Sequence, residues 1–154
     1  MSVGYYEGGV YNNYWVLIFS YPENSHTEDY RQEVLNLVNA QRAKYGLTAL
    51  EMGDDALTAA AQTRAEEISV VNSHVRPDGS KCFTVLKDYG VTDTPTGENA
   101  AWGSVSPEEV VNAWMNSEGH RANILNPEAR KMSVGYYYNS NSTWGHQWIQ
   151  IFTK

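Results

Sequence analysis

The sequence Met132-Ser133-Val134-Gly135-Tyr136-Tyr137 repeats, residue for residue, the first six residues of the chain. In each copy a loop rich in Gly, Asn and Ser follows, and then a second apolar stretch, at residues 15–19 and again at 148–152. Aromatic and β-branched residues on both sides of turn-forming residues predict a β-hairpin. We therefore expect one hairpin at each end of the chain.

Between the two hairpins, the spacing of apolar residues predicts helices. Ser25 or Thr27 can cap the first, which Gly46 ends, and the second begins near Asp54 or Asp55 and runs through Ile68. A short helix is expected at residues 83–88, a fourth begins at Ser106-Pro107, and one more turn is expected at 121–125. Because strands bracket helices, we expect an α+β protein with an antiparallel sheet between helical layers.

The bulk composition restricts the classes of function. The 154 residues, 42% of them hydrophobic, suffice for one core. A formal net charge of −7 repels phosphate backbones and anionic lipids, so nucleic acid is not an expected partner. The single cysteine, Cys82, excludes an internal disulfide. The longest apolar run, residues 14–19, is too short to span a membrane and lacks the basic flank of a signal peptide.

The repeated hairpin has two interpretations. Residues 1–22 are the tail of an upstream repeat, or they are a hairpin of this domain that extends its sheet. In both cases residues 23–154 form the main domain.

Four stretches resemble the bacterial branch of the CAP superfamily, which comprises the cysteine-rich secretory, antigen 5 and pathogenesis-related-1 proteins. They are residues 35–47, residues 73–79 with Ser73-His74 and the turn Arg76-Pro77-Asp78-Gly79, Gly97-Glu98-Asn99, and residues 114–125 with Gly119-His120-Arg121. Each is short, but the four occur in the same order over most of residues 30–152. The resemblance implies a three-layer α-β-α sandwich with a central antiparallel sheet and an extracellular location.

The resemblance also implies a cleft in which a histidine at the end of the second helix meets a glutamate. These positions correspond to His74 and Glu98. A second glutamate and a second histidine complete the cleft in eukaryotic members, but here those positions hold Ser117, next to Glu118, and Gln147, next to His146. Neighbouring residues of a strand face opposite ways, so His146 need not enter the cleft. His120 is the preferred second histidine.

Two interpretations of these residues stay open. His74, His120 and Glu98 are a candidate set of ligands for a divalent metal such as zinc, with one open coordination position. Alternatively, His74 and Glu98 hydrogen-bond to each other and stiffen the loop without a metal. Glu98 and His74 are also the only candidates for a catalytic role, and neither Ser73 nor Ser117 lies in a nucleophile motif.

The leading hypothesis is a binding module, secreted or on the surface of a Gram-positive-type bacterium, whose ligand is protein, cell-wall material or lipid. The cleft residues are His74, Glu98, Ser117, Glu118, His120 and Gln147. A metal-assisted hydrolase of peptides or cell-wall material is the alternative enzyme hypothesis. A third is a structural module that links tandem domains or self-associates through its hairpins.

Overall fold

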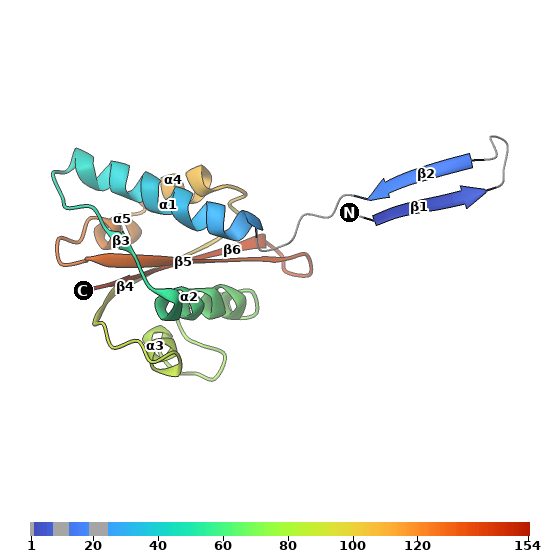
Figure 1. Ribbon diagram of the computed structural model, residues 1–154. Coiled ribbons are helices and arrows are strands. Elements are labelled where there is room, and N and C mark those ends of the chain that lie inside the picture. The colour runs from blue at the N-terminus through green and yellow to red at the C-terminus, as the bar shows by residue number, and fades with distance from the viewer. Residues whose placement is uncertain (1, 8–12, 19–24) are drawn as a thin grey trace.

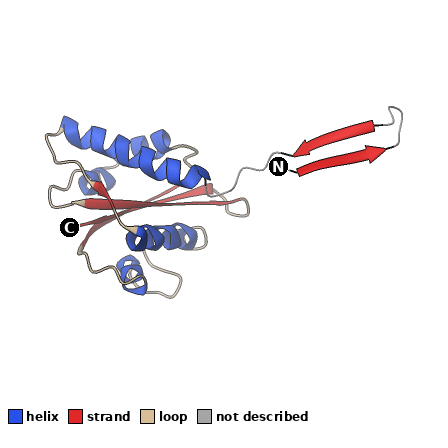
Figure 2. Cartoon of the chain, viewed as in Figure 1, coloured by secondary structure: helices blue, strands red, loops and turns tan. Residues whose placement is uncertain are grey.

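The computed structural model describes residues 2–7, 13–18 and 25–154. Its helices are α1 (Ser25–Lys44), α2 (Asp55–Ile68), the 3-10 helix η1 (Cys82–Thr84), α3 (Val85–Asp88), α4 (Pro107–Asn116) and α5 (Glu118–Ile124). Its strands are β1 (Ser2–Glu7), β2 (Asn13–Ile18), β3 (Glu51–Met52), β4 (Pro95–Trp102), β5 (Lys131–Asn139) and β6 (Gly145–Thr153). The expected α+β class is confirmed (Figure 2).

A four-stranded sheet in the order β3-β5-β6-β4 forms the centre of the domain. β6 pairs antiparallel with both β5 and β4, and the two-residue edge strand β3 runs parallel to β5. The sheet is therefore antiparallel, as expected, except at this one edge. The C-terminal copy of the repeated sequence supplies both inner strands, which explains why residues 132–135 and 147–153 are buried.

Helices cover both faces of this sheet (Figure 1). α1 and α4 lie on one face and α2 and α3 on the other, while α5 contacts both α4 and the edge strand β4. The expected three-layer α-β-α arrangement is confirmed. The core on the α1 side includes the large side chains Trp114, Trp148 and Phe152, all without exposed surface.

The helix boundaries follow from local chemistry that the sequence predicted. The Asp54 side chain accepts a hydrogen bond from the Leu57 amide at 2.9 Å and so caps α2. Ser106 caps α4 in the same way, ahead of Pro107 at the first helical position. Gly46 has a φ of +70°, the left-handed conformation that ends α1.

Three expectations about the helices need correction. The last helix begins at Glu118, three residues before Arg121, because the chain turns at Ser117 and restarts a helix at once. The short third helix is split into η1 and α3 and starts at Cys82. α2 ends at Ile68, so His74 lies in the loop after this helix and not at its end.

The strands β1 and β2 pair antiparallel with each other and form a two-stranded sheet of their own. Neither is hydrogen-bonded to a strand of the four-stranded sheet. Within the described part of the chain, no helix is both long and apolar enough to cross a membrane.

Candidate functional site

The buried ion pair of Arg64 and Glu98 is the centre of the candidate site. Glu98 lies in the middle of β4, and its side chain is only 2% exposed. Arg64, on the sheet-facing side of α2, donates from Nε to Oε2 at 2.9 Å and from its terminal nitrogen NH2 to Oε1 at 3.2 Å. The guanidinium therefore holds both oxygens of the carboxylate, which is the strongest geometry for such a pair.

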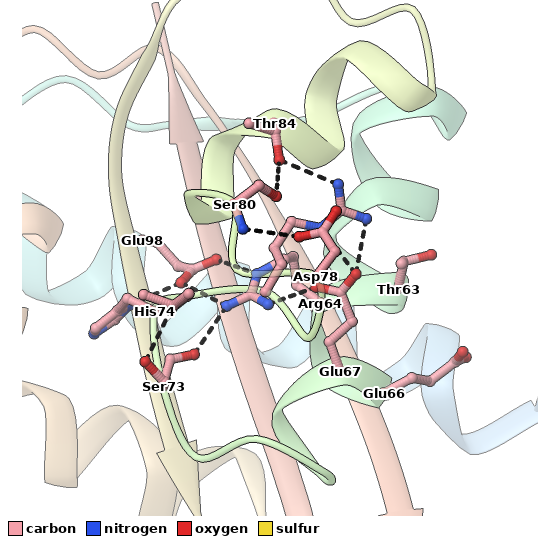
Figure 3. Close-up of polar contacts among 12 residues, drawn as sticks. Thr63, Arg64, Glu66, Glu67, Ser73, His74, Asp78, Ser80, Thr84 and Glu98 are labelled. Carbon is pink, nitrogen blue, oxygen red and sulfur yellow. Dashed lines mark hydrogen bonds and ion pairs between the residues drawn. The ribbon is translucent and has the colours of Figure 1, made fainter.

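His74 completes this cluster from the loop after α2 (Figure 3). Its Nδ1 lies 2.8 Å from Oε1 of Glu98, yet 55% of its side chain is exposed. Arg64 also donates to the carbonyl of Ser73 at 3.1 Å, so the cation that holds Glu98 also fixes the backbone next to His74. Within the described residues, Nε2 of His74 has no hydrogen-bond partner. One edge of the imidazole is thus anchored and the other is open.

The contacts within the cluster shift two pKa values in opposite directions. Burial alone would raise the pKa of Glu98, but hydrogen bonds and charges from His74 and Arg64 outweigh it and lower the pKa. The hydrogen bond to Glu98 raises the pKa of His74, although partial burial opposes this. Glu98 is therefore a carboxylate at neutral pH, and His74 is more readily protonated than an ordinary histidine.

A second group of charges holds the loop that carries His74. The turn Arg76-Pro77-Asp78-Gly79 closes with a 2.9 Å hydrogen bond from the Gly79 amide to the Arg76 carbonyl, as the sequence predicted. The Arg76 side chain also forms ion pairs with Glu67 at 2.8 Å and with Asp88 at 2.7 Å. Glu67 binds Arg64 as well, so both arginines are tied to one carboxylate of α2. This network connects α2, the loop and α3.

Two asparagines fasten α5 against β4 and so place His120. Asn123 donates to the carbonyl of Glu98 at 3.2 Å and to the side chain of Asn99 at 2.8 Å, and Asn99 donates to the carbonyl of His120 at 3.1 Å. Gly97 permits this approach, because a Cβ there would lie 2.7 Å from the Asn123 side chain. Burial, and then the nearby charge of His74, lower the pKa of the half-buried His120. The site therefore combines His74, which is protonated more readily than an ordinary histidine, with His120, which is neutral at neutral pH.

Ser117 and Glu118 lie where α4 passes into α5. Ser117 is half-buried, and its carbonyl accepts from the Arg121 amide at 2.8 Å. Glu118 is exposed in the first turn of α5. Both are close to His120 in sequence, but neither side chain has a hydrogen bond to Glu98 or His74.

The structure places Gln147 and His146 away from this cluster. Gln147 is fully buried and bonds to Ser142 at 2.7 Å. It lies four residues along β6 from Ile151, the strand partner of Glu98, which is about 13 Å at the usual rise of a strand. His146 lies 2.8 Å from the hydroxyl of Tyr136, which packs against α1, so it faces away from the α2 side where Glu98 lies.

His74, His120 and Glu98 would form a metal site only if their side-chain donor atoms were free to bind the ion. Among the described residues, no group of three or more His, Cys, Asp or Glu side chains is arranged to hold a metal ion. Both oxygens of Glu98 accept from the Arg64 guanidinium, a fixed cation that repels a second one. This donor set does not fit a divalent metal at Glu98, so we derive no chemical step through one.

The arrangement offers little to covalent catalysis. Burial, followed by the charge of Glu98, raises the pKa of the Cys82 thiol to about 11, so this buried cysteine stays protonated at neutral pH. The lowered pKa of Glu98 makes it a weak base. The site can still bind a ligand through hydrogen bonds from Nε2 of His74 and from the imidazole of His120.

Sequence reasoning missed Arg64, the residue that organises the site. A signal was present, because Arg64 lies four residues after Ala60 and four before Ile68, on the apolar stripe of the second helix. A charged residue on the buried face of a helix indicates a buried partner of opposite charge.

Comparison with known proteins identifies the family of this chain. The model of the family described as "Cysteine-rich secretory protein family", or CAP, matches residues 35–152. The Bacillus subtilis (strain 168) protein YkwD, itself described as uncharacterized, is 42% identical over 122 residues, which are 78% of this chain and 47% of YkwD. The uncharacterized membrane protein YlbC of the same strain is 33% identical over 115 residues, 71% of this chain and 33% of YlbC. The chain thus spans less than half the length of either relative.

Two solved structures have a similar fold. An extracellular protein of Bacillus anthracis with an SCP domain superposes with a TM-score of 0.75 at 23% identity, covering 92% of this chain and 46% of that one. An outer surface protein of Borrelia burgdorferi gives a TM-score of 0.65 at 25% identity, covering 80% of this chain and 90% of that one. The family match covers far more than half of the sequence and the fold agrees with it, so this chain belongs to the CAP family of cysteine-rich secretory proteins.

Proposed function

We propose that this chain is an extracellular or cell-surface binding module that holds a cell-wall ligand against His74 and His120. The observation that carries the proposal is the half-anchored imidazole of His74. Its Nδ1 is fixed by Glu98 at 2.8 Å while more than half of its side chain is exposed. A rigid, exposed donor suits recognition, because little conformational freedom is lost when a ligand binds.

The electrostatics of the site support binding over hydrolysis. Arg64 neutralises Glu98, so the carboxylate orients His74 and does not itself activate a water. A protonated His74 is a donor for a carboxylate or carbonyl oxygen, and the neutral His120 can accept a hydrogen bond. Peptide stems of the cell wall carry both kinds of group. The names of two similar structures, an extracellular protein and an outer surface protein, support the proposed location.

The test is a pull-down of the chain with purified cell-wall sacculi. We expect wild type to bind and the double variant His74→Ala with His120→Ala to lose at least about tenfold in affinity, or roughly 1.4 kcal/mol. His146→Ala is the matched control, because it removes a half-buried histidine that faces away from Glu98. Equal binding by wild type and the double variant would overturn the proposal. Phospholipid vesicles run in parallel test lipid as the ligand.

A calorimetric zinc titration of the same proteins separates binding from the metal-assisted alternative. The commitment of Glu98 to Arg64 leads us to expect no stoichiometric zinc binding by wild type. Zinc binding that disappears in the double variant but not in His146→Ala would instead favour a metal site.

A further inference from the structure

The N-terminal hairpin matches the central hairpin in its strand register as well as in its sequence. The identical residues of β1 and β5 include Ser2 and Ser133, Gly4 and Gly135, and Tyr5 and Tyr136. Their cross-strand partners also correspond, Ile18 with Ile151, Val16 with Ile149 and Trp15 with Trp148. Five residues separate the two strands in each copy, and the second hairpin has one more pair at its loop end, Asn139 with Gly145. β1 and β2 therefore reproduce the backbone pairing of the two inner strands of the CAP sheet.

The close approach of helix α2 explains the glycine of this pattern at position 135. Gly135 lies against α2 so closely that a Cβ built on it would overlap the backbone carbonyl of Ala61. A glycine inside a strand otherwise weakens it, because the strand gains flexibility and loses a packing side chain. Gly4 lies at the matching position of β1, so the N-terminal hairpin also contains a glycine that weakens its strand. That hairpin forms a sheet of its own.

Residues for the opposite layer are also repeated. Val134 and Trp148 are fully buried in the core beneath α1 and α4, and the N-terminal hairpin has the same residues at Val3 and Trp15. A hairpin that pairs only with itself is marginal in water, since it has no layer to cover its apolar face. The first hairpin thus carries residue types suited to a helix layer on each face.

We propose that the β1–β2 hairpin is an insertion element that completes the sheet of a second CAP unit, in the place that β5 and β6 occupy here. Within its own domain that place is filled, so the partner is a different CAP unit whose helical layers and β4 equivalent lack a central hairpin. One difference describes this partner further. Leu17 replaces Gln150, which accepts a hydrogen bond from Asn99, so the partner's β4 needs no amide at that position.

Co-expression of two variants of this chain, residues 1–154, tests this inference. The recipient carries two substitutions. Gly135→Val makes its own β5–β6 hairpin clash with α2. Gly4→Val makes the same change in its β1–β2 hairpin, so that hairpin cannot take the place of β5 and β6. The donor is the tagged wild-type chain, and the matched control donor carries Gly4→Val alone. We expect the wild-type donor to raise the soluble recipient roughly tenfold by mass action and to form a one-to-one complex, whereas the control donor does neither.

A further donor sharpens the result. Leu17→Gln restores the amide that faces Asn99 in this recipient and should increase the yield of the complex further. Equal rescue by wild-type and Gly4→Val donors, or rescue by neither, would overturn the proposal. A recipient that folds alone with wild-type stability would overturn it too, because Gly135 would then not be needed beneath α2. None of these outcomes depends on what the His74 site binds.

Discussion

The two faces of the central sheet are packed with side chains of different size. The face beneath α1 and α4 is filled with large side chains, including Trp114, Trp148 and Phe152. On the other face, α2 presents small residues, Ala60, Ala61 and Ala65, and a buried arginine. Alanine lets the α2 backbone approach β5 closely, and the Arg64–Glu98 pair lies on the same side of the sheet. One face is thus packed around aromatic side chains, whereas the other combines smaller aliphatic side chains with a rigid polar site.

The largest loss of stability is expected for a substitution on the face beneath α1 and α4. Trp148→Ala should lower the free energy of unfolding by about 4 kcal/mol, because it empties a fully buried site and removes the 2.7 Å hydrogen bond to the Ser104 carbonyl. Urea denaturation followed by circular dichroism measures this. Trp148→Phe is the control and should cost about half as much, since it keeps most of the ring. A loss below about 1 kcal/mol for the alanine variant would contradict the assignment of Trp148 to the fully buried core of this face.

The second largest loss of stability is expected when the buried ion pair of Arg64 and Glu98 is broken. Arg64→Met should destabilise the protein by about 3 kcal/mol, because it leaves the Glu98 charge buried without its guanidinium. Adding Glu98→Leu to Arg64→Met should recover most of that loss, since the pair is then replaced by apolar groups of similar size. The same denaturation curves provide the double-mutant cycle. If Glu98→Leu lowers the free energy of unfolding of the Arg64→Met variant further, the two side chains are not coupled in the way described.

A smaller effect is expected for His74, which is more than half exposed. His74→Ala should change stability by less than about 1 kcal/mol, since solvent screens the pair. The pH dependence is more specific. Because the folded pKa of His74 is raised, its stabilisation is fully present below the ordinary value of 6.5 and is lost as pH rises through the folded value. The difference in stability between wild type and His74→Ala should therefore shrink over that window, and a difference that stays constant across it would contradict the raised pKa of His74.

The smallest effect is a coupling between the two imidazoles, which NMR titration of their ring protons can detect. His74 should titrate above the ordinary histidine pKa and His120 below it. In His74→Ala the pKa of His120 should rise but remain below the ordinary value, because burial is the larger cause of its shift. A His120 pKa that does not move would separate the two residues and weaken the proposed joint binding site.

The sequence predicted those features that rest on local chemistry. Asp54 and Ser106 cap their helices, Gly46 ends one, and the repeated hairpin forms twice, because each depends on residues adjacent in the chain. The contact of His74 with Glu98 was expected from the family resemblance and is confirmed.

What the sequence did not predict depends on contacts between distant elements. Arg64 and Glu98 are 34 residues apart, and their contact follows only once α2 is laid across β4. The family resemblance alone groups Gln147 with the site, and its distance from Glu98 follows only from the β4–β6 register. The face that His146 occupies was likewise settled by the pairing of its strand, which places it beside Tyr136.

The order of strands in the sheet has a consequence for synthesis on the ribosome. β4 is made well before β6, but β6 is the strand to which β4 is hydrogen-bonded in the four-stranded sheet. β5 likewise lacks its antiparallel partner until residues 145–153 have been translated. The nascent domain therefore emerges as helices without a sheet to cover, and its core can close only after β6 has left the exit tunnel. Such a chain remains open to chaperones or an export machinery until β6 has been translated.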